Sequence, residues 1–199
     1  MATWLVVGLG NPGPAYARHR HNVGAMTAVE LARRGGGVWR SQRLLKADTA
    51  EVRVGDAGVG AVGADLDRLI VARPRTYMNE SGIAVRNLIG QLKLKADHLI
   101  VVHDELDLDF GRLRVKYSGG DNGHNGLKSI RSLLRTGDYF RVRIGIGRPD
   151  GRMDVVDWVL SDFSRPESAD LPEVVGRAAD AVAALTRHGL DAAQQRYNS

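Results

Sequence analysis

The residues in this chain that are best suited to chemistry fall into four polar clusters, each after a short apolar run. A folded protein loses stability when polar groups approach its core, unless those groups are hydrogen-bonded or used. We therefore interpret the clusters as one site assembled from distant loops, with a histidine as general base beside an orienting carboxylate and several amides. The clusters are Gly8-Leu9-Gly10-Asn11-Pro12-Gly13 with Arg20-His21-Asn22, Tyr77-Met78-Asn79, His103-Asp104-Glu105, and Gly123-His124-Asn125-Gly126.

His21 is the candidate base, because it stands where a helix from about Asn22 to Arg34 is predicted to begin. The partial positive charge at a helix N-terminus lowers the pKa of a nearby histidine. A lowered pKa would keep the imidazole neutral at pH 7, which is the form that a base requires. A lone histidine at this position is more often a surface or capping residue, so the interpretation depends on the other clusters.

Asp104 is the candidate partner of this base. It follows the apolar run Leu99–Val102, where a carboxylate is costly unless it accepts hydrogen bonds. Bonded to a ring N–H, it would fix the tautomer of a histidine and stabilise the protonated ring. A cap or a salt bridge is the alternative. Since the chain has no cysteine and no G-x-S-x-G motif, water activated by His21 is the simplest nucleophile.

Three asparagines, Asn11, Asn79 and Asn125, could hold a peptide-like backbone or a ribose, because an amide side chain offers both a donor and an acceptor. Each also has a structural alternative. Asn11 lies in a Gly/Pro turn, Asn79 could be the N-cap of the helix that follows it, and Asn125 stands just before another helix.

Two other kinds of site are disfavoured. The run from Gly8 to Gly13 matches G-x-G-x-x-G, but Pro12 and Pro14 remove N–H groups that would bind pyrophosphate, and no acid follows about 20 residues later. His19 and His21 form an H-x-H pair without a third metal ligand at a suitable spacing. We expect no metal and no cofactor.

Positive charge is concentrated in one segment. The whole chain carries a formal charge of +5, whereas residues 110–148 hold nine Lys or Arg and two Asp, which gives +7. Such a concentration indicates a polyanionic partner, with a solvated basic face as the alternative. Arg112, Arg114 and Lys116 alternate along a predicted strand and so share one face, as do Arg141 and Arg143 on another, an arrangement that suits a phosphate backbone.

Apolar runs and turn residues predict an α/β protein: a single globular domain over residues 1–199, built on a twisted mixed β-sheet flanked by helices, with a C-terminal tail from about residue 188. Sites in open α/β sheets lie beyond the carboxyl ends of strands, so the first and third clusters can meet if their strands are neighbours. The expected strands are Thr3–Leu9, Ala50–Val54, Val59–Val62, Leu69–Ala72, Leu99–Val102, Arg112–Tyr117 and Phe140–Ile146; the expected helices are about Asn22–Arg34, Glu80–Leu92, Gly126–Leu134 and Pro172–Arg187.

Composition excludes several classes of protein. The absence of cysteine excludes a disulfide framework and cysteine-ligated metal. The N-terminal residues lack the pattern of a signal peptide, and no apolar stretch approaches the roughly 18 residues that span a membrane. We therefore expect a cytoplasmic protein that does not associate with membranes.

Taken in order, the motifs from about Trp4 to Arg187 resemble the bacterial peptidyl-tRNA hydrolase family. The resemblance implies a monomeric, metal-free esterase whose partner is peptidyl-tRNA dropped from stalled ribosomes, gripped at its acceptor end and phosphate backbone. Such an enzyme cuts the ester that joins the peptide to the ribose of the 3′-terminal adenosine. The motifs that carry the resemblance are Val7–Gly13, Tyr16, Arg20–Gly24, Pro74–Gly82, His103–Leu108, Gly123–Lys128 and Arg141–Gly147.

The resemblance also implies roles for individual residues. His21 would be the base and Asp104 its partner, while Asn11 would contact the peptide side of the ester and help to reject free aminoacyl-tRNA, whose amine is charged. Asn79 and Asn125 would position the peptide backbone and the water or developing oxyanion. Other expected contacts are Tyr16, Tyr77 and Met78 along the cleft, and Lys116 and Arg143, with Arg114 as a weaker third, on tRNA phosphate.

The chain departs from the family at Ser118, Asp121 and Asn122, where glycine is frequent, and Asp121 adds a negative charge near the expected RNA path. Two rival functions remain: a non-catalytic RNA-binding relative, and a small-molecule esterase on the same scaffold. The joint presence of the base, its partner and the amides disfavours the first, and the basic segment disfavours the second.

Overall fold

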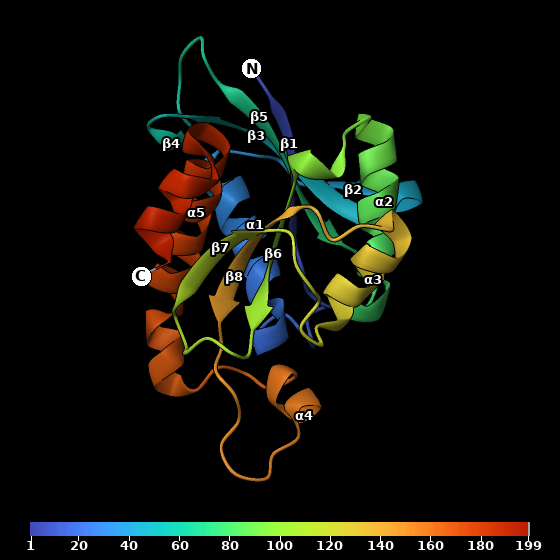
Figure 1. Cartoon of the computed structure of the whole chain (residues 1–199), viewed down its shortest axis with the longest axis vertical. Coiled ribbons are helices and arrows are strands. Elements are labelled where there is room, and N and C mark those ends of the chain that lie inside the picture. The colour runs from blue at the N-terminus through green and yellow to red at the C-terminus, as the bar shows by residue number, and fades with distance from the viewer. Residues whose placement is uncertain (199) are drawn as a thin grey trace.

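An eight-stranded mixed β-sheet forms the centre of the molecule, with helices on both of its faces (Figure 1). The structure is a computed structural model that describes residues 1–198. The strands are β1 (Thr3–Gly8), β2 (Arg40–Gln42), β3 (Ala47–Gly55), β4 (Gly58–Val59), β5 (Asp67–Pro74), β6 (Leu99–Glu105), β7 (Leu113–Tyr117) and β8 (Phe140–Gly145). The helices are α1 (Val23–Arg34), α2 (Ser81–Leu92), α3 (Asn125–Leu134), α4 (Val155–Val159) and α5 (Arg165–Tyr197), with short 3₁₀ turns η1 (Arg20–Asn22), η2 (Arg43–Leu45), η3 (Met78–Glu80) and η4 (Ala96–His98).

The strand order, β2-β3-β5-β1-β6-β8-β7 with β4 beside β3, confirms the predicted mixed sheet. The central strands β5, β1, β6 and β8 are parallel, whereas β3 and β7 run antiparallel to their inner neighbours. Because β1 lies directly beside β6, the loops after these two strands begin at the same edge of the sheet, as expected of a site assembled there.

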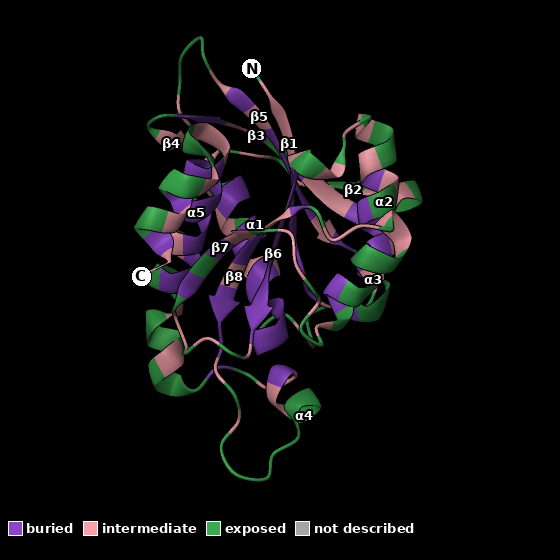
Figure 2. Cartoon of the chain, in the orientation of Figure 1, coloured by how far each residue is buried: buried purple, intermediate pink, exposed green. Residues whose placement is uncertain are grey.

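Alternate side chains of β1 enter two separate cores. Val6 packs with α1 and α5 on one face of the sheet, while Leu5 and Val7 pack with α2 and α3 on the other. Figure 2 shows the consequence: the central strands are buried, and the outward faces of the helices are exposed. No helix within residues 1–198 combines the length and apolarity that a bilayer-spanning segment needs.

Two glycines allow α1 to approach the sheet closely. A side chain at Gly24 would collide with the backbone carbonyl of Val102 on β6, and one at Gly8 would collide with the carbonyl of Gly24. Gly8 of the G-x-G-x-x-G run therefore serves the contact between α1 and the sheet, whereas a side chain at Gly13 would meet nothing.

The C-terminal region differs from its prediction. Helix α5 begins at Arg165 rather than Pro172, behind a capping box formed by Ser164 and Glu167. Residues from about 188, which were expected to form a tail, are helical again after a break at Gly189, whose φ of 82° is left-handed. Burial of Ala193 and Tyr197 anchors this last segment.

The C-terminal segment also reaches the sheet edge. At the edge strand β7, the backbone N–H of Val115 donates to Oδ1 of Asn198 at 2.6 Å. The carbonyl of Val115 accepts from Nδ2 of Asn198 and from Nε2 of Gln194, both at 3.1 Å. Side chains from the end of the chain thus occupy backbone groups that the edge strand leaves unpaired.

Candidate active site

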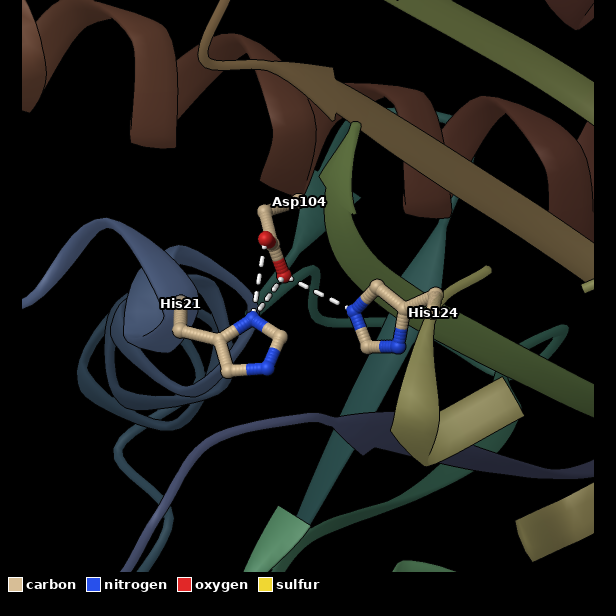
Figure 3. Close-up of side chains that lie close together, drawn as sticks. All are labelled: His21, Asp104 and His124. Carbon is tan, nitrogen blue, oxygen red and sulfur yellow. Dashed lines mark hydrogen bonds and ion pairs between the residues drawn. The ribbon is translucent and has the colours of Figure 1, made fainter. Parts of the chain in front are cut away.

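His21 and Asp104 form a buried hydrogen-bonded pair (Figure 3). His21 lies in η1, immediately before α1, and its Nδ1 is 2.9 Å and 3.0 Å from the two carboxylate oxygens of Asp104 on β6. Nδ1 therefore carries the hydrogen and donates to the carboxylate. The other ring nitrogen, Nε2, makes no hydrogen bond within residues 1–198 and is free to accept a proton. The predicted pairing of these two residues is present in the structure.

The expected direction of the His21 pKa is wrong. Burial does lower it, but the charge of Asp104 and its hydrogen bond outweigh burial, so the pKa of His21 is raised above its ordinary value of 6.5. A carboxylate at 2.9 Å acts more strongly than a helix terminus. Burial alone would raise the pKa of Asp104, yet the neighbouring His21 and His124 lower it, so Asp104 is a carboxylate at neutral pH.

His124 completes the cluster, a role that the sequence pattern does not predict. Its Nε2 lies 2.8 Å from Oδ1 of Asp104, on the opposite side from His21 (Figure 3). Its Nδ1 accepts hydrogen bonds from the backbone N–H groups of Gly126 at 3.1 Å and Leu127 at 3.4 Å, which makes it the N-cap of α3. The available signal was the position of His124 in the Gly-rich segment that leads into the helix predicted from about Gly126.

The donor set of His21, Asp104 and His124 resembles a metal site in composition, since one potential ligand atom from each lies within 4.8 Å of the others. The hydrogen bonds argue otherwise. Because Nδ1 of His124 accepts from α3, its Nε2 must bear a hydrogen, whereas a metal would need a lone pair there. His19 of the H-x-H pair contacts Asp162 and does not join the cluster.

Asn11 is held in a second group beside this cluster. Its side-chain oxygen accepts the backbone N–H of Met78 at 2.7 Å. Asn22 fixes its backbone reciprocally, accepting from the N–H of Asn11 at 3.0 Å and donating to its carbonyl at 2.9 Å. The sequence pattern does not predict this role of Asn22, because the role depends on how its side chain meets the backbone of Asn11 in the loop.

Met78, whose backbone is bonded to Asn11, and His124 both lie against Gly126 and so bring the two groups together. A Cβ added to Gly126 would lie 2.7 Å from Sδ of Met78 and 3.1 Å from Cε1 of His124. Tyr77 is exposed and packs edge-on against Tyr16, with ring centroids 6.0 Å apart. The loops after β1, β5 and β6 and the start of α3 thus meet in one region, as the four clusters predict.

The side chains of Asn79 and Asn125 are exposed, and Asn125 and Asn11 line different cavities. Asn125 lines a cavity of about 110 Å³ together with His21, Asp104 and His124, and valines of α4 form its far wall. Asn11 lines a separate cavity of about 430 Å³. Asn79 lies in η3, and the residue that precedes α2 is Glu80, so Asn79 is not the N-cap of α2.

The predicted basic contacts share one face of the sheet. Arg114 on β7 pairs in register with Arg143 on β8, and Lys116 pairs with Arg141. Lys116, Arg141 and Arg143 line a cavity of about 340 Å³ with His103. Arg143 is not free, because its Nη2 lies 2.8 Å from the buried carboxylate of Glu105.

Arg141 has a structural function and is not exposed, although the sequence pattern places it on a phosphate-binding face. It is buried, and its guanidinium donates to the backbone carbonyls of Gly119, Gly120 and Gly137. The bonds to Gly119 and Gly120 hold the loop between β7 and α3 over the basic face, and the bond to Gly137 ties it to the segment before β8.

The model of the peptidyl-tRNA hydrolase family matches residues 5–199. This chain belongs to the peptidyl-tRNA hydrolase family. It is 53% identical to the peptidyl-tRNA hydrolase of Cutibacterium acnes, over 99% of this chain and 98% of that protein, and 50% identical to that of Streptomyces avermitilis, over 100% and 95%. The crystal structure of peptidyl-tRNA hydrolase from Acinetobacter baumannii matches with a TM-score of 0.85 at 30% identity, over 99% of this chain and 95% of that one.

In this member of the peptidyl-tRNA hydrolase family, Ser118, Asp121 and Asn122, where the resemblance led us to expect glycine, each form a side-chain hydrogen bond. Oγ of Ser118 donates to Asp138 at 2.6 Å, and the carboxylate of Asp121 accepts the N–H of Gly123 at 3.0 Å. Nδ2 of Asn122 donates to Glu105 at 2.9 Å and to Asp107 at 2.8 Å. Ser118 and Asn122 have φ angles of 64° and 49°, where glycine is the least strained residue. At these two positions the side-chain hydrogen bonds offset the backbone strain.

Proposed function

We propose that this protein hydrolyses peptidyl-tRNA at the ester between the peptide and the ribose of the 3′-terminal adenosine, and so recycles tRNA from stalled or aborted translation. Family membership across nearly the whole chain supports this substrate. The observation that carries the chemistry is the buried His21–Asp104 pair, in which one ring nitrogen is bound and the other is free.

In the proposed mechanism, Nε2 of His21 removes a proton from water as the water oxygen attacks the ester carbonyl. Asp104 stabilises the imidazolium, which then returns the proton to the departing ribose oxygen, leaving a free peptide carboxyl and a tRNA hydroxyl. General base catalysis contributes about 10²–10⁴-fold. Asn79 and Asn125 position the peptide backbone and the water or oxyanion, and a single oxyanion donor is worth about 10²–10³-fold.

Asn11 accounts for selection of the blocked substrate. Its side-chain oxygen is occupied by the N–H of Met78, which leaves its Nδ2 hydrogens as donors. A peptide carbonyl can accept from these donors, whereas the ammonium of free aminoacyl-tRNA has only donors to offer. Tyr16, Tyr77 and Met78 line the cleft beside it.

The tRNA is bound through its phosphates by Lys116 and Arg143, with Arg114 as a weaker contact, and a single copy of the chain suffices. The common face of these residues on β7 and β8 supports the proposal.

The test compares N-acetyl-aminoacyl-tRNA with unblocked aminoacyl-tRNA for the wild type and His21→Ala, with His19→Ala as the matched control in the same loop. We expect cleavage of the blocked substrate only. His21→Ala should lower kcat by at least about 10²-fold with little change in tRNA binding, and His19→Ala should retain activity.

Other outcomes identify the rivals. A wild-type protein that binds tRNA without cleavage would favour the RNA-binding function. Cleavage that excess uncharged tRNA does not inhibit would favour a small-molecule esterase. Full activity of His21→Ala would remove His21 as the base.

A further inference from the structure

Asp104 lies between two histidines in one continuous chain of hydrogen bonds (Figure 3). His21 donates to both carboxylate oxygens, at 2.9 Å and 3.0 Å, and His124 donates to Oδ1 at 2.8 Å. Behind His124, the first N–H groups of α3 donate to its Nδ1. The N-terminus of a ten-residue helix is thus connected to the proposed base through one imidazole and one carboxylate.

The tautomer of His124 follows from its partners. A hydrogen on Nδ1 would point at two N–H groups and at the positive end of α3, so the hydrogen must be on Nε2, where it faces the carboxylate. His124 is therefore a neutral donor whose direction is set by the helix, and it cannot replace His21 as a base.

We propose that His124 is a positioning residue that divides the Asp104 carboxylate between two histidines, and so keeps His21 neutral enough to act as a base near neutral pH. This inference rests on the proposed function. An unshared carboxylate would concentrate its charge on His21 and favour the imidazolium, which cannot accept a proton. A second donor, polarised by the start of α3, withdraws part of that charge.

Few other ionisable groups face His21. On η1 itself, Arg20 is turned away and pairs with Glu167 of α5 at 2.7 Å. Helix α4 presents only valines to the cavity, and Glu105 on β6 is paired with Arg143. Asp104 and His124, whose ring centroid is 4.9 Å from that of His21, are therefore the polar groups that set its protonation.

His103 does not compete for the carboxylate. Its ring is 5.1 Å from that of His124, but its Nδ1 donates to the backbone carbonyl of Asp104 at 2.7 Å. Burial lowers the pKa of His103 to about 3, so the ring is neutral and adds no charge beside the pair.

Two variants separate the donor from the helix cap. In His124→Asn, the shorter side chain still caps α3 but cannot reach Asp104. In His124→Gln, the longer amide can place its N–H₂ group where Nε2 stood. The first readout is an NMR titration of His21 in the free protein. We expect the midpoint to rise by about one pH unit in His124→Asn, a tenfold change in proton affinity, and to return toward wild type in His124→Gln.

The second readout is the pH profile of hydrolysis. The acidic limb of kcat/KM should move to higher pH by the same amount in His124→Asn, with KM for tRNA unchanged. Because the titration needs no substrate, a shifted midpoint in a protein that fails to hydrolyse peptidyl-tRNA would refute the proposed function alone. An unchanged midpoint in His124→Asn, or equal shifts in both variants, would overturn the role of His124.

A third measurement needs no variant. The ¹⁵N shifts of wild-type His124 should report hydrogen on Nε2 and a lone pair on Nδ1. Hydrogen on Nδ1 would refute the inference even if both variants failed to fold.

Discussion

Protonation of His21 beside Asp104 stabilises the fold but removes the proposed base. Because the folded-state pKa of His21 is raised above 6.5, the protonated pair stabilises the fold fully below that value. This contribution is lost as pH rises through the raised pKa. The proposed base is neutral only above the same pKa, so we expect activity to increase over the range in which this stabilisation fades.

Replacing Asp104 tests that balance. In Asp104→Asn, burial would act on His21 without an opposing charge, so the acidic limb of kcat/KM should move to lower pH. At the same time kcat should fall by about 10²–10⁴-fold, because neither the tautomer nor the imidazolium is supported. Steady-state pH profiles measure both effects, and Asp109→Asn is the control, since Asp109 is exposed and outside the cluster. A limb that moves to higher pH would contradict this account.

Sequence predicts His21 and Asp104 in the hydrogen-bond chain but not His124, which lies between Asp104 and α3. His21 and Asp104 could be paired because each follows an apolar run that predicts a strand, and adjacent strands bring such ends together. His124 and Asn22 could not, because their contacts depend on how a helix start and a turn are oriented. The direction of the His21 pKa also required the distance to Asp104.

At the level of elements, buried strands are well predicted and exposed ones are not. Strands β1 and β6 have continuous apolar runs, whereas β2 is the polar edge segment Arg40–Gln42 and carries no such signal. The expected strand Val59–Val62 shortens to β4 because Gly60 has a φ of 83° and Val62 is fully exposed. Helix α4, which closes the cavity over His21, is only five residues long and was not predicted.

The loop between β7 and α3 gives a test at this scale. Asn122→Gly removes two hydrogen bonds to carboxylates but relieves a left-handed backbone, which costs a non-glycine residue about 1–2 kcal/mol. We expect little change in global stability. Amides of residues 118–124 should exchange with solvent faster, as measured by hydrogen–deuterium exchange, while α5 is unaffected.

Ser118→Gly provides the comparison, since it releases the other end of the loop from Asp138. Exchange rates in residues 118–124 that stay at the wild-type value in Asn122→Gly would show that the bonds of Arg141 and Ser118 hold the loop without Asn122.

At the scale of the whole molecule, part of the charge of the basic segment is neutralised by acidic residues that lie outside that segment in the sequence. Arg143 pairs with Glu105, and Arg148 pairs with Asp107 at 2.7 Å. Arg114 and Lys116 form no ion pair within residues 1–198, so both carry free charge on the basic face. The concentration of charge is predictable from sequence, but which charges remain available is not.

Salt dependence distinguishes the two proposed phosphate contacts. Lys116→Gln should raise KM for peptidyl-tRNA and reduce the slope of log kcat/KM against log salt by about one, with Tm unchanged. Arg143→Gln should also lower Tm, because it leaves Glu105 buried without its partner. Arg86→Gln on α2 is the control outside the basic segment. An unchanged slope in Lys116→Gln would exclude a phosphate contact there.

The amide of Asn198 occupies both backbone groups of Val115 as a neighbouring strand would, so the end of the chain closes an edge of the sheet against other molecules. An open edge is a template for edge-to-edge aggregation. We expect a chain shortened before Gly189 to associate in a concentration-dependent way in light scattering, and Asn198→Ala to do so more weakly. A shortened chain that stays monodisperse would contradict this. If the shortened chain associates as expected, protection from self-association depends on a few amide hydrogen bonds at the C-terminal segment, far from any catalytic residue.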